Sequence, residues 1–366
     1  MRTTNIVQLG IKELWGLLRD PMMLILIVYA FTISIYTSSK AQPETLNQAA
    51  LAIVDEDKSP VAARIITAFN PPYFTIPRLI SQTEMDTGLD TFALNIPPNF
   101  QRDMLAQRSP TIQLNVDATR MSQAFTGAGY IQTIVSDEVS EFLARYRSAA
   151  ALPIDLALRA RFNPELNKGW FGAINNVISS VTMLSIILTG AALIREREHG
   201  TIEHLLVMPV TPFEIMASKI WSMGFVVLLA ASVSLVFIVQ GLLSVPIGGS
   251  VPLFLFGTAL YLFAMTSMGI FLATVGGSMP QFGLLLTLVL MPLQMLSGAT
   301  TPRESMPEII QKIMLAAPNT HFVILAQAVL FRGAGLAVVW LQFAALLVIG
   351  AILFFFSLRR FRNFLR

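Results

Sequence analysis

The sequence contains no cysteine among its 366 residues, and charged residues make up only 13% of it. Without cysteine, the chain has no disulfide and no thiolate site for zinc or redox chemistry. A soluble domain usually carries about 25% charged residues, whereas this chain is 54% hydrophobic. The composition therefore predicts a membrane protein.

Two kinds of functional group are also missing. No Gly-x-x-x-x-Gly-Lys-Ser/Thr motif occurs, and this is the motif that cradles ATP phosphates in P-loop proteins. The long apolar runs lack charged residues and histidine at their centres, although carriers driven by protons or ions usually need such groups. If ATP drives this chain, a separate subunit must bind the ATP. The net charge is only +3, and the basic residues are not clustered in a stripe, so nucleic-acid binding is not expected.

Residues 1–20 are expected to form a cytoplasmic amphipathic helix, because Val7, Ile11 and Trp15 recur at helical spacing among polar residues. Pro21 should end this helix. The uncharged run 21–38 that follows is just long enough to cross a hydrocarbon core of about 30 Å. The same region also fits a cleaved signal peptide. We favour a retained membrane anchor, because the leading region is patterned as a helix of its own.

Residues 39–170 carry charges of both signs and no run long enough to span a membrane. Short runs bounded by turn residues predict strands at 51–54, 92–96 and 111–116. Helices are predicted at 60–69, 99–107 and 122–147. This pattern predicts a water-exposed α/β domain with a small sheet. Three acidic residues at 55–57 could suggest a calcium loop, but they lack the glycine and the distant glutamate of an EF-hand. We interpret them as a turn after a strand.

Five further apolar runs lie within residues 171–358, at 171–194, 220–243, 252–274, 281–299 and 336–357. Together with 21–38 they predict a mostly α membrane protein of six transmembrane helices, with the α/β domain inserted between the first and second. Basic residues at the N-terminus, at 195–219 and in the tail 359–366 orient the chain by the positive-inside rule. Both termini are therefore expected in the cytoplasm. Residues 39–170 are expected outside, and helices within 301–335 are expected at the outer interface or dipping into it.

Polar residues inside the apolar runs are candidates for a substrate path. These are Asn175, Asn176, Ser179 and Gln294. Hydrogen bonding between helices is the alternative, and we favour it for any single residue because membrane bundles use such bonds routinely.

No catalytic residues are predicted. His199, Glu203 and His204 resemble an inverse zincin motif but are spaced one residue too far apart. We interpret them as a polar patch, and no metal site or cofactor is expected in this chain.

Residues 195–219 form the densest polar segment between two apolar runs, and two prolines prevent one continuous helix there. An ordinary solvated connector could have such a composition. The segment is, however, similar to the loop after the second membrane helix of ABC-2 type permeases, the membrane subunits of one class of ABC transporters. The similar positions are Glu196, Glu198, Gly200, Thr201, Glu203, Leu205, Leu206, Pro209 and Lys219.

The resemblance extends along the chain, since residues 121–127 and 301–306 also resemble bacterial inner-membrane members of the family. It implies a permease subunit of an ABC exporter, with a short coupling helix in the loop that receives motion from an ATPase subunit. ATP and Mg²⁺ would then bind in that partner. A second permease copy and a periplasmic membrane-fusion protein are further implied partners.

Two other functions compete with this interpretation. A membrane receptor could bind a ligand on its external domain, but no cytoplasmic output domain is recognisable in the sequence. A channel usually contains charged or carbonyl-rich filter segments, and none stands out here.

Overall fold

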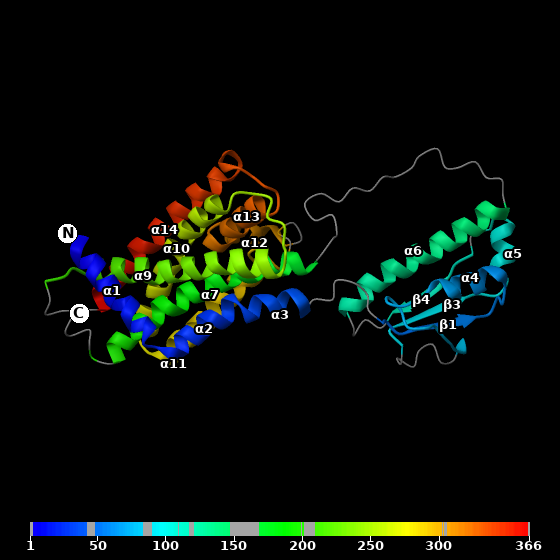
Figure 1. The fold of residues 1–366 in the computed structure, drawn as a ribbon, viewed down its shortest axis with the longest axis horizontal. Helices are drawn as coiled ribbons and strands as arrows, with labels where there is room; N and C mark the ends of the chain where they lie inside the picture. Colours follow the sequence, from blue (N-terminus) through cyan, green and yellow to red (C-terminus); the bar gives the residue numbers. More distant parts are fainter. Residues whose placement is uncertain are drawn as a thin grey trace. The chain divides into compact units, whose positions relative to one another are not determined.

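The computed structural model describes residues 3–41, 48–82, 90–108, 110–116, 121–146, 168–198, 200, 209–301, 303 and 306–364. The chain divides into two compact units. We call Met1–Gln42 with Ala160–Arg366 the helical unit, and Pro43–Arg159 the sheet unit. Figure 1 shows the elements of both.

The helical unit is built around the long helix α7 (Figure 1). In α7, 83% of the most apolar stretch is buried, against 22% in α14. Contacts surround α7 from α3, α9, α10 and α11. The elements of this unit are α1 (Thr3–Leu18), α2 (Pro21–Phe31), α3 (Ile33–Ala41), α7 (Lys168–Glu198), α9 (Pro212–Val233) with its π-helical continuation η3 (Ser234–Leu242), α10 (Val251–Gly276), α11 (Met279–Met295), α12 (Glu308–Met314), α13 (Pro318–Leu330) and α14 (Leu336–Phe364).

Local sequence signals set the helix boundaries. The Asp20 side chain accepts a hydrogen bond from the Met23 amide at the start of α2, with proline in the first turn. A capping box between Thr211 and Glu214 begins α9. Gly277 ends α10 in the left-handed conformation, at φ 72°, which glycine adopts without strain. These signals explain why the apolar runs become separate helices.

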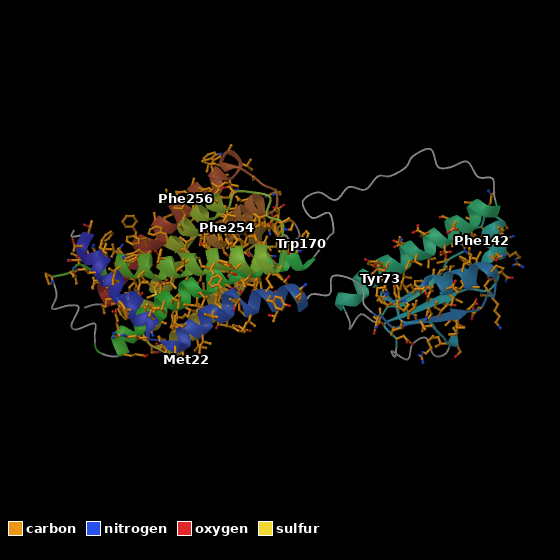
Figure 2. The ribbon with its side chains drawn as sticks, viewed as in Figure 1. Met22, Tyr73, Phe142, Trp170, Phe254 and Phe256 are labelled. Atoms are coloured by element: carbon orange, nitrogen blue, oxygen red, sulfur yellow. The ribbon has the colours of Figure 1, made fainter. Side chains whose placement is uncertain are left out.

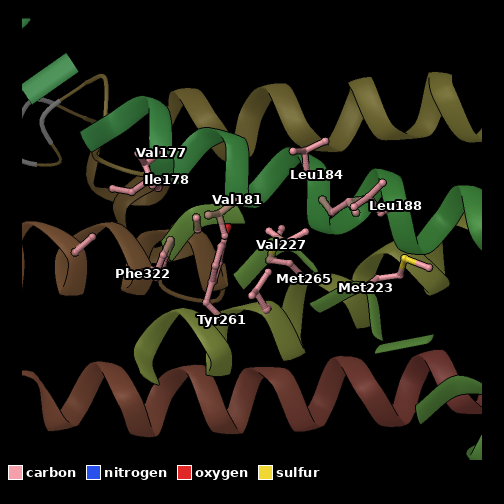
Figure 3. Packing of buried hydrophobic residues seen from close by; sticks show 14 of the residues in the cluster. Val177, Ile178, Val181, Leu184, Leu188, Met223, Val227, Tyr261, Met265 and Phe322 are labelled. Carbon is pink, nitrogen blue, oxygen red and sulfur yellow. The ribbon is translucent and has the colours of Figure 1, made fainter. Parts of the chain in front are cut away.

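The core of the helical unit lies where α7 faces α9 and α10 (Figure 3). Val181, Leu184 and Leu188 of α7 are buried there, and Tyr261 of α10 stacks on Phe322 of α13 with ring centroids 4.0 Å apart. Helices α7 and α10 approach closely at Gly269. A Cβ atom added to this residue would lie only 2.8 Å from the Ile186 carbonyl oxygen. Such small residues allow membrane helices to pack backbone to backbone.

The first predicted span is interrupted. Helix α2 ends at Phe31, and Thr32 leaves helical geometry before α3 begins. Two carbonyls at the break accept hydrogen bonds from neighbouring helices: Ser180 Oγ donates to Ala30 O over 3.1 Å, and Ser234 Oγ donates to Phe31 O over 2.6 Å. These hydroxyls compensate backbone groups that a break in lipid would otherwise leave unpaired.

The candidate spans coincide with the six predicted runs only in part. Five helices in the described part of the chain are long and apolar enough to cross a membrane, or six if the bent pair α12 and α13 counts as one. The predicted span 281–299 is the 17-residue helix α11, which contains Pro292 and reaches only Met295. At about 1.5 Å per residue, α11 is shorter than a ~30 Å hydrocarbon core.

Of the two positions expected for helices within 301–335, at the outer interface or dipping into it, the buried helix α13 fits the second. Axes of α12 and α13 meet at 89°, and most residues of α13 are buried against α7, α10 and α14. Asn319 explains the inward position: its side chain donates to Leu293 O over 2.7 Å and accepts from the Tyr261 hydroxyl over 2.9 Å. A buried amide with both ends bonded can remain inside the bundle.

Several helices extend beyond the apolar runs from which they were predicted. Helix α7 extends through Glu198, and α14 continues to Phe364. The segment 359–364 of the predicted basic tail is therefore helical. The reason is that charged residues with good helix propensity continue a helix that hydropathy alone would end.

The sheet unit is an α/β fold with strand order β2-β1-β3-β4. Strands β2, β1 and β3 are parallel, and β4 pairs antiparallel to β3. The predicted strands and helices of this region are confirmed, and β2 is an addition. The elements are β1 (Leu51–Asp55), α4 (Pro60–Ala68), β2 (Arg78–Leu79), β3 (Phe92–Ile96), α5 (Phe100–Leu105), β4 (Gln113–Val116) and α6 (Met121–Tyr146).

Helix α6 covers the core of the sheet unit. Its Phe142 is buried in that core, and Tyr130 stacks on Tyr73 with centroids 5.4 Å apart; Phe142 and Tyr73 are labelled in Figure 2. Arg64 of α4 forms an ion pair of 2.8 Å with Glu138 of α6. The two helices are therefore held together on the sheet.

The acidic residues 55–57 form a turn, as the sequence analysis predicted. Asp55 Oδ1 accepts hydrogen bonds from the amides of Asp57 and Lys58, over 3.1 Å and 2.8 Å. Asp57 in turn accepts from the Gln101 amide in α5. These carboxylates are satisfied by backbone groups, which is the usual role of aspartate after a strand.

Candidate coupling site

The predicted loop 195–219 is helical at both ends. Helix α7 continues through Glu198, and α9 begins at Pro212. Gly200, at φ 68°, follows the end of α7, and its amide donates to Arg197 O over 3.1 Å. Pro209 is exposed. Thr201, Glu203, Leu205 and Leu206 lie outside the described residues, so the coupling helix stays a prediction.

Lys219 is a buried cation within α9. Its side chain is 1% exposed, and Nζ lies 2.8 Å from Glu13 Oε1 of α1 and 2.7 Å from Glu196 Oε2 of α7. Glu196 Oε1 lies 2.8 Å from Lys12 Nζ, also on α1. We call Lys12, Glu13, Glu196 and Lys219 the charge cluster. It joins three helices that are far apart in the sequence.

The charge cluster constrains the arrangement of these helices. Burial raises the pKa of the Glu13 carboxyl, and the nearby Lys219 ammonium opposes part of this rise. Removing one partner of a buried ion pair typically costs about 3–5 kcal/mol, because the other charge is left without compensation. The intact pair adds much less net stability, since both groups lost their hydration on burial. The main consequence of the ion pairs is that α1, α7 and α9 are held in one position relative to each other.

Four consecutive charged residues at the end of α7 contact four different neighbours. Arg195 forms an ion pair with Asp20, between α1 and α2. Glu196 belongs to the charge cluster. The Arg197 guanidinium lies 4.4 Å from the Phe364 ring centroid in α14. Glu198 accepts the amide hydrogen of Met279 at the start of α11, over 3.2 Å.

Helix geometry explains this arrangement. Successive side chains on an α-helix point about 100° apart, so four in a row cover its whole circumference. We call residues 195–198 with their partners the α7 junction. A displacement of this end of α7 must move or break contacts to α1, α9, α11 and α14 together.

Helix α1 is also fixed to α9 by an indole. Trp221 Nε1 donates to Ile6 O over 3.1 Å. The Trp221 ring packs directly against Gly10, in the space that a larger side chain at this position would fill. A Cβ atom on Gly10 would lie 2.1 Å from a ring carbon of Trp221. Helix α1 thus packs against the bundle through a close contact as well as through charges.

The structure places Glu196 and Lys219, both predicted to meet the ATPase subunit, in contacts within this chain. Lys12, Glu13 and Asp20 were not singled out from the sequence. A signal was present: Lys219 lies well inside α9, a helix that is mostly apolar. A buried lysine requires acidic partners, but the sequence does not identify them.

The candidate path residues bond to neighbouring helices and loops. Asn175 Nδ2 donates to Ala299 O over 2.8 Å, and Asn176 Nδ2 donates to Ser34 Oγ over 3.0 Å. Ser179 is half-buried on the same helix, and Gln294 is half-buried on α11. The two asparagine bonds agree with the interhelical role that the sequence analysis favoured for such residues.

A bundle of five or six membrane spans around a central helix is the architecture of a multi-pass membrane protein. Residues 21–359 match the family described as ABC-2 family transporter protein, and the chain belongs to this family. The resemblance seen in the sequence is therefore confirmed. Family membership makes the chain a transport permease and implies an ABC ATPase partner.

Curated relatives agree along nearly the full length. The chain is 60% identical over 363 residues to the inner membrane transport permease YhhJ of Escherichia coli K12, covering 98% of this chain and 97% of the relative. Identity to YhhJ of Shigella flexneri has the same values. The probable multidrug ABC transporter permease YbhR of E. coli K12 is 27% identical over 347 residues, or 93% of each chain. These similarities support a multi-pass inner-membrane protein.

Proposed function

We propose that this chain is the membrane-spanning subunit of an ABC exporter, which moves a substrate across the inner membrane with ATP hydrolysed by a separate subunit. Two copies would combine with two ATPase subunits. The single observation that supports this most strongly is the α7 junction. It connects the most buried helix of the bundle to three other membrane helices and to α1.

The mechanism we propose starts at residues 199–211, which connect α7 to α9. Closure of the ATPase subunits on ATP would press on this segment. The charge cluster would transmit the push to α1 and α9, because buried ion pairs resist separation. The contacts of Arg197 and Glu198 would carry it to α14 and α11. The bundle would then rock as a rigid body between two states, as transporters commonly do.

We also propose the orientation given by the basic residues. Both termini and the α7 junction would face the cytoplasm, and the sheet unit would lie in the periplasm. There the sheet unit could engage a membrane-fusion protein. The positive-inside rule supports this orientation, because Arg195 and Arg197 flank one span and Arg359, Arg360 and Arg362 end another.

Reconstitution tests the proposal. The full-length chain should be co-expressed with a candidate P-loop ATPase subunit, purified and inserted into liposomes. We expect the two proteins to co-purify, and ATP hydrolysis to occur only when both are present. ATP turnover by the isolated chain, after contaminants are excluded, would contradict the proposal, and so would an ATPase that never associates with it.

A further inference from the structure

A polar cleft of about 640 Å³ lies where three membrane helices end. Helix α7 ends beside it at Glu198, α10 at Gly276 and α14 at Phe364. Its polar lining side chains are Arg197, Thr274, Ser278, Gln281, Arg360 and Asn363.

In the orientation proposed above, on which this inference rests, the cleft would lie at the level of the cytoplasmic lipid headgroups. The candidate spans that contain α7 and α14 are 30 and 29 residues long. At ~1.5 Å per residue, each is about 45 Å long, whereas the hydrocarbon core is about 30 Å thick. Their ends therefore extend beyond the acyl chains. Val275, which is 44% exposed, brings an apolar surface to the same cleft.

The cleft has the chemistry of an anion site. Two of its lining side chains are arginines, and no carboxylate is among its described lining residues. Arg197 is held over the Phe364 ring, and its side chain donates a long hydrogen bond of 3.4 Å to Gly277 O. Ser278 begins α11 without a side-chain capping bond. Glu198 lies nearby, but its carboxylate already accepts the Met279 amide.

We propose that this cleft binds the phosphate of an anionic phospholipid headgroup, such as that of phosphatidylglycerol. Arginine binds phosphate oxygens through paired hydrogen bonds. Basic pockets between membrane helices at the cytoplasmic side are suited to anionic headgroups. The exposed Val275 suits the start of an acyl chain, which a free phosphate compound does not have. The bound lipid would join α14 and the α10–α11 turn to the α7 junction through Arg197.

Native mass spectrometry of the detergent-purified full-length chain tests this inference. The chain is titrated with phosphatidylglycerol and with phosphatidylcholine of the same acyl chains. We expect the wild type to bind phosphatidylglycerol more tightly. Arg360→Gln should weaken that binding about fivefold, the usual effect of one basic residue near an anionic lipid. Arg360 is exposed at a helix end, so the variant should fold, and Arg360→Lys should recover most of the affinity.

Arg362→Gln is the matched control, because Arg362 is exposed on the same end of α14 but does not line the cleft. It should change the affinity by less than about twofold. Equal losses in both glutamine variants would overturn the inference, since they would show only general attraction to a basic tail. Equal binding of the two lipids would also overturn it. Displacement of the lipid by an equal concentration of glycerol 3-phosphate would assign the cleft to free phosphate compounds instead. Unchanged lipid binding with loss of the ATPase subunit in Arg360→Gln would assign it to the protein partner.

Discussion

Lys219 of α9 and Glu196 of α7 form a buried ion pair of 2.7 Å at the cytoplasmic end that we propose for the bundle. Residues 199–211 connect the same two helices. The two helices are therefore joined twice, by the connecting segment and by the buried ion pair. A force applied to the connecting segment would act on both helices together. This arrangement is the structural basis of the coupling we propose.

Replacing Lys219 should destabilise the protein strongly. Lys219→Met leaves Glu13 and Glu196 buried without their shared cation, and we expect a cost of about 3–5 kcal/mol. Lys12→Met is the control, because the Lys12 side chain is 52% exposed and exposed pairs contribute about 0–1 kcal/mol. Thermal unfolding of the purified chain measures both. Similar midpoints for the two variants would show that the buried cluster has no special energetic role.

Adding a methyl group at Gly10 should disturb the contact between α1 and α9. A Cβ at this position would lie 2.1 Å from a ring carbon of Trp221, and overpacking of this kind costs about 1–3 kcal/mol. Gly16→Ala is the matched control on the same helix, since nothing lies within 4 Å of its Cβ position. There the better helix propensity of alanine should be neutral or stabilising, by about 0.5–1 kcal/mol. If Gly10→Ala unfolds at the same temperature as Gly16→Ala, α1 is not packed as described.

The orientation can be tested with reporters, since it rests on the distribution of basic residues. An enzyme fused after Gln107 should be active only outside the cytoplasm, and one fused after residue 366 only inside. The expected pattern follows from the positive-inside rule. A cytoplasmic signal from the Gln107 fusion would overturn the topology. Loss of an N-terminal tag during maturation would instead support a cleaved signal peptide.

Sequence patterns predicted the regular elements well, because they depend on local physics. Apolar run length identified α7, α9, α10 and α14, and short runs bounded by turn residues identified the strands β1 and β3. What these patterns left open depends on long-range contacts. The buried position of α13 depends on Asn319 bonding to Leu293 and Tyr261, residues far away in the sequence. Hydropathy alone does not decide between an interfacial and a buried position for such a helix.

The same limit applies to the candidate site. The resemblance indicated that residues 195–219 matter, but it assigned all nine positions to one external contact. Glu196 and Lys219 instead pair with each other and with α1. Lys219 and Glu13 are 206 residues apart, so no local pattern could have joined them. A buried charge in an apolar helix predicts that a partner exists, while only the fold identifies it.

Charge reversal in the connecting segment tests the central claim most directly. If Glu203, Leu205 and Leu206 meet the ATPase subunit, then Glu203→Lys, or Leu205→Asp with Leu206→Asp, should place an uncompensated charge in a buried interface, at a cost of several kcal/mol. An exposed connector would tolerate these changes within about 0.5 kcal/mol. The measurement is co-purification of the ATPase subunit together with ATP hydrolysis in liposomes, using variants shown to insert normally. The account predicts loss of both binding and hydrolysis; wild-type values for both variants would contradict it.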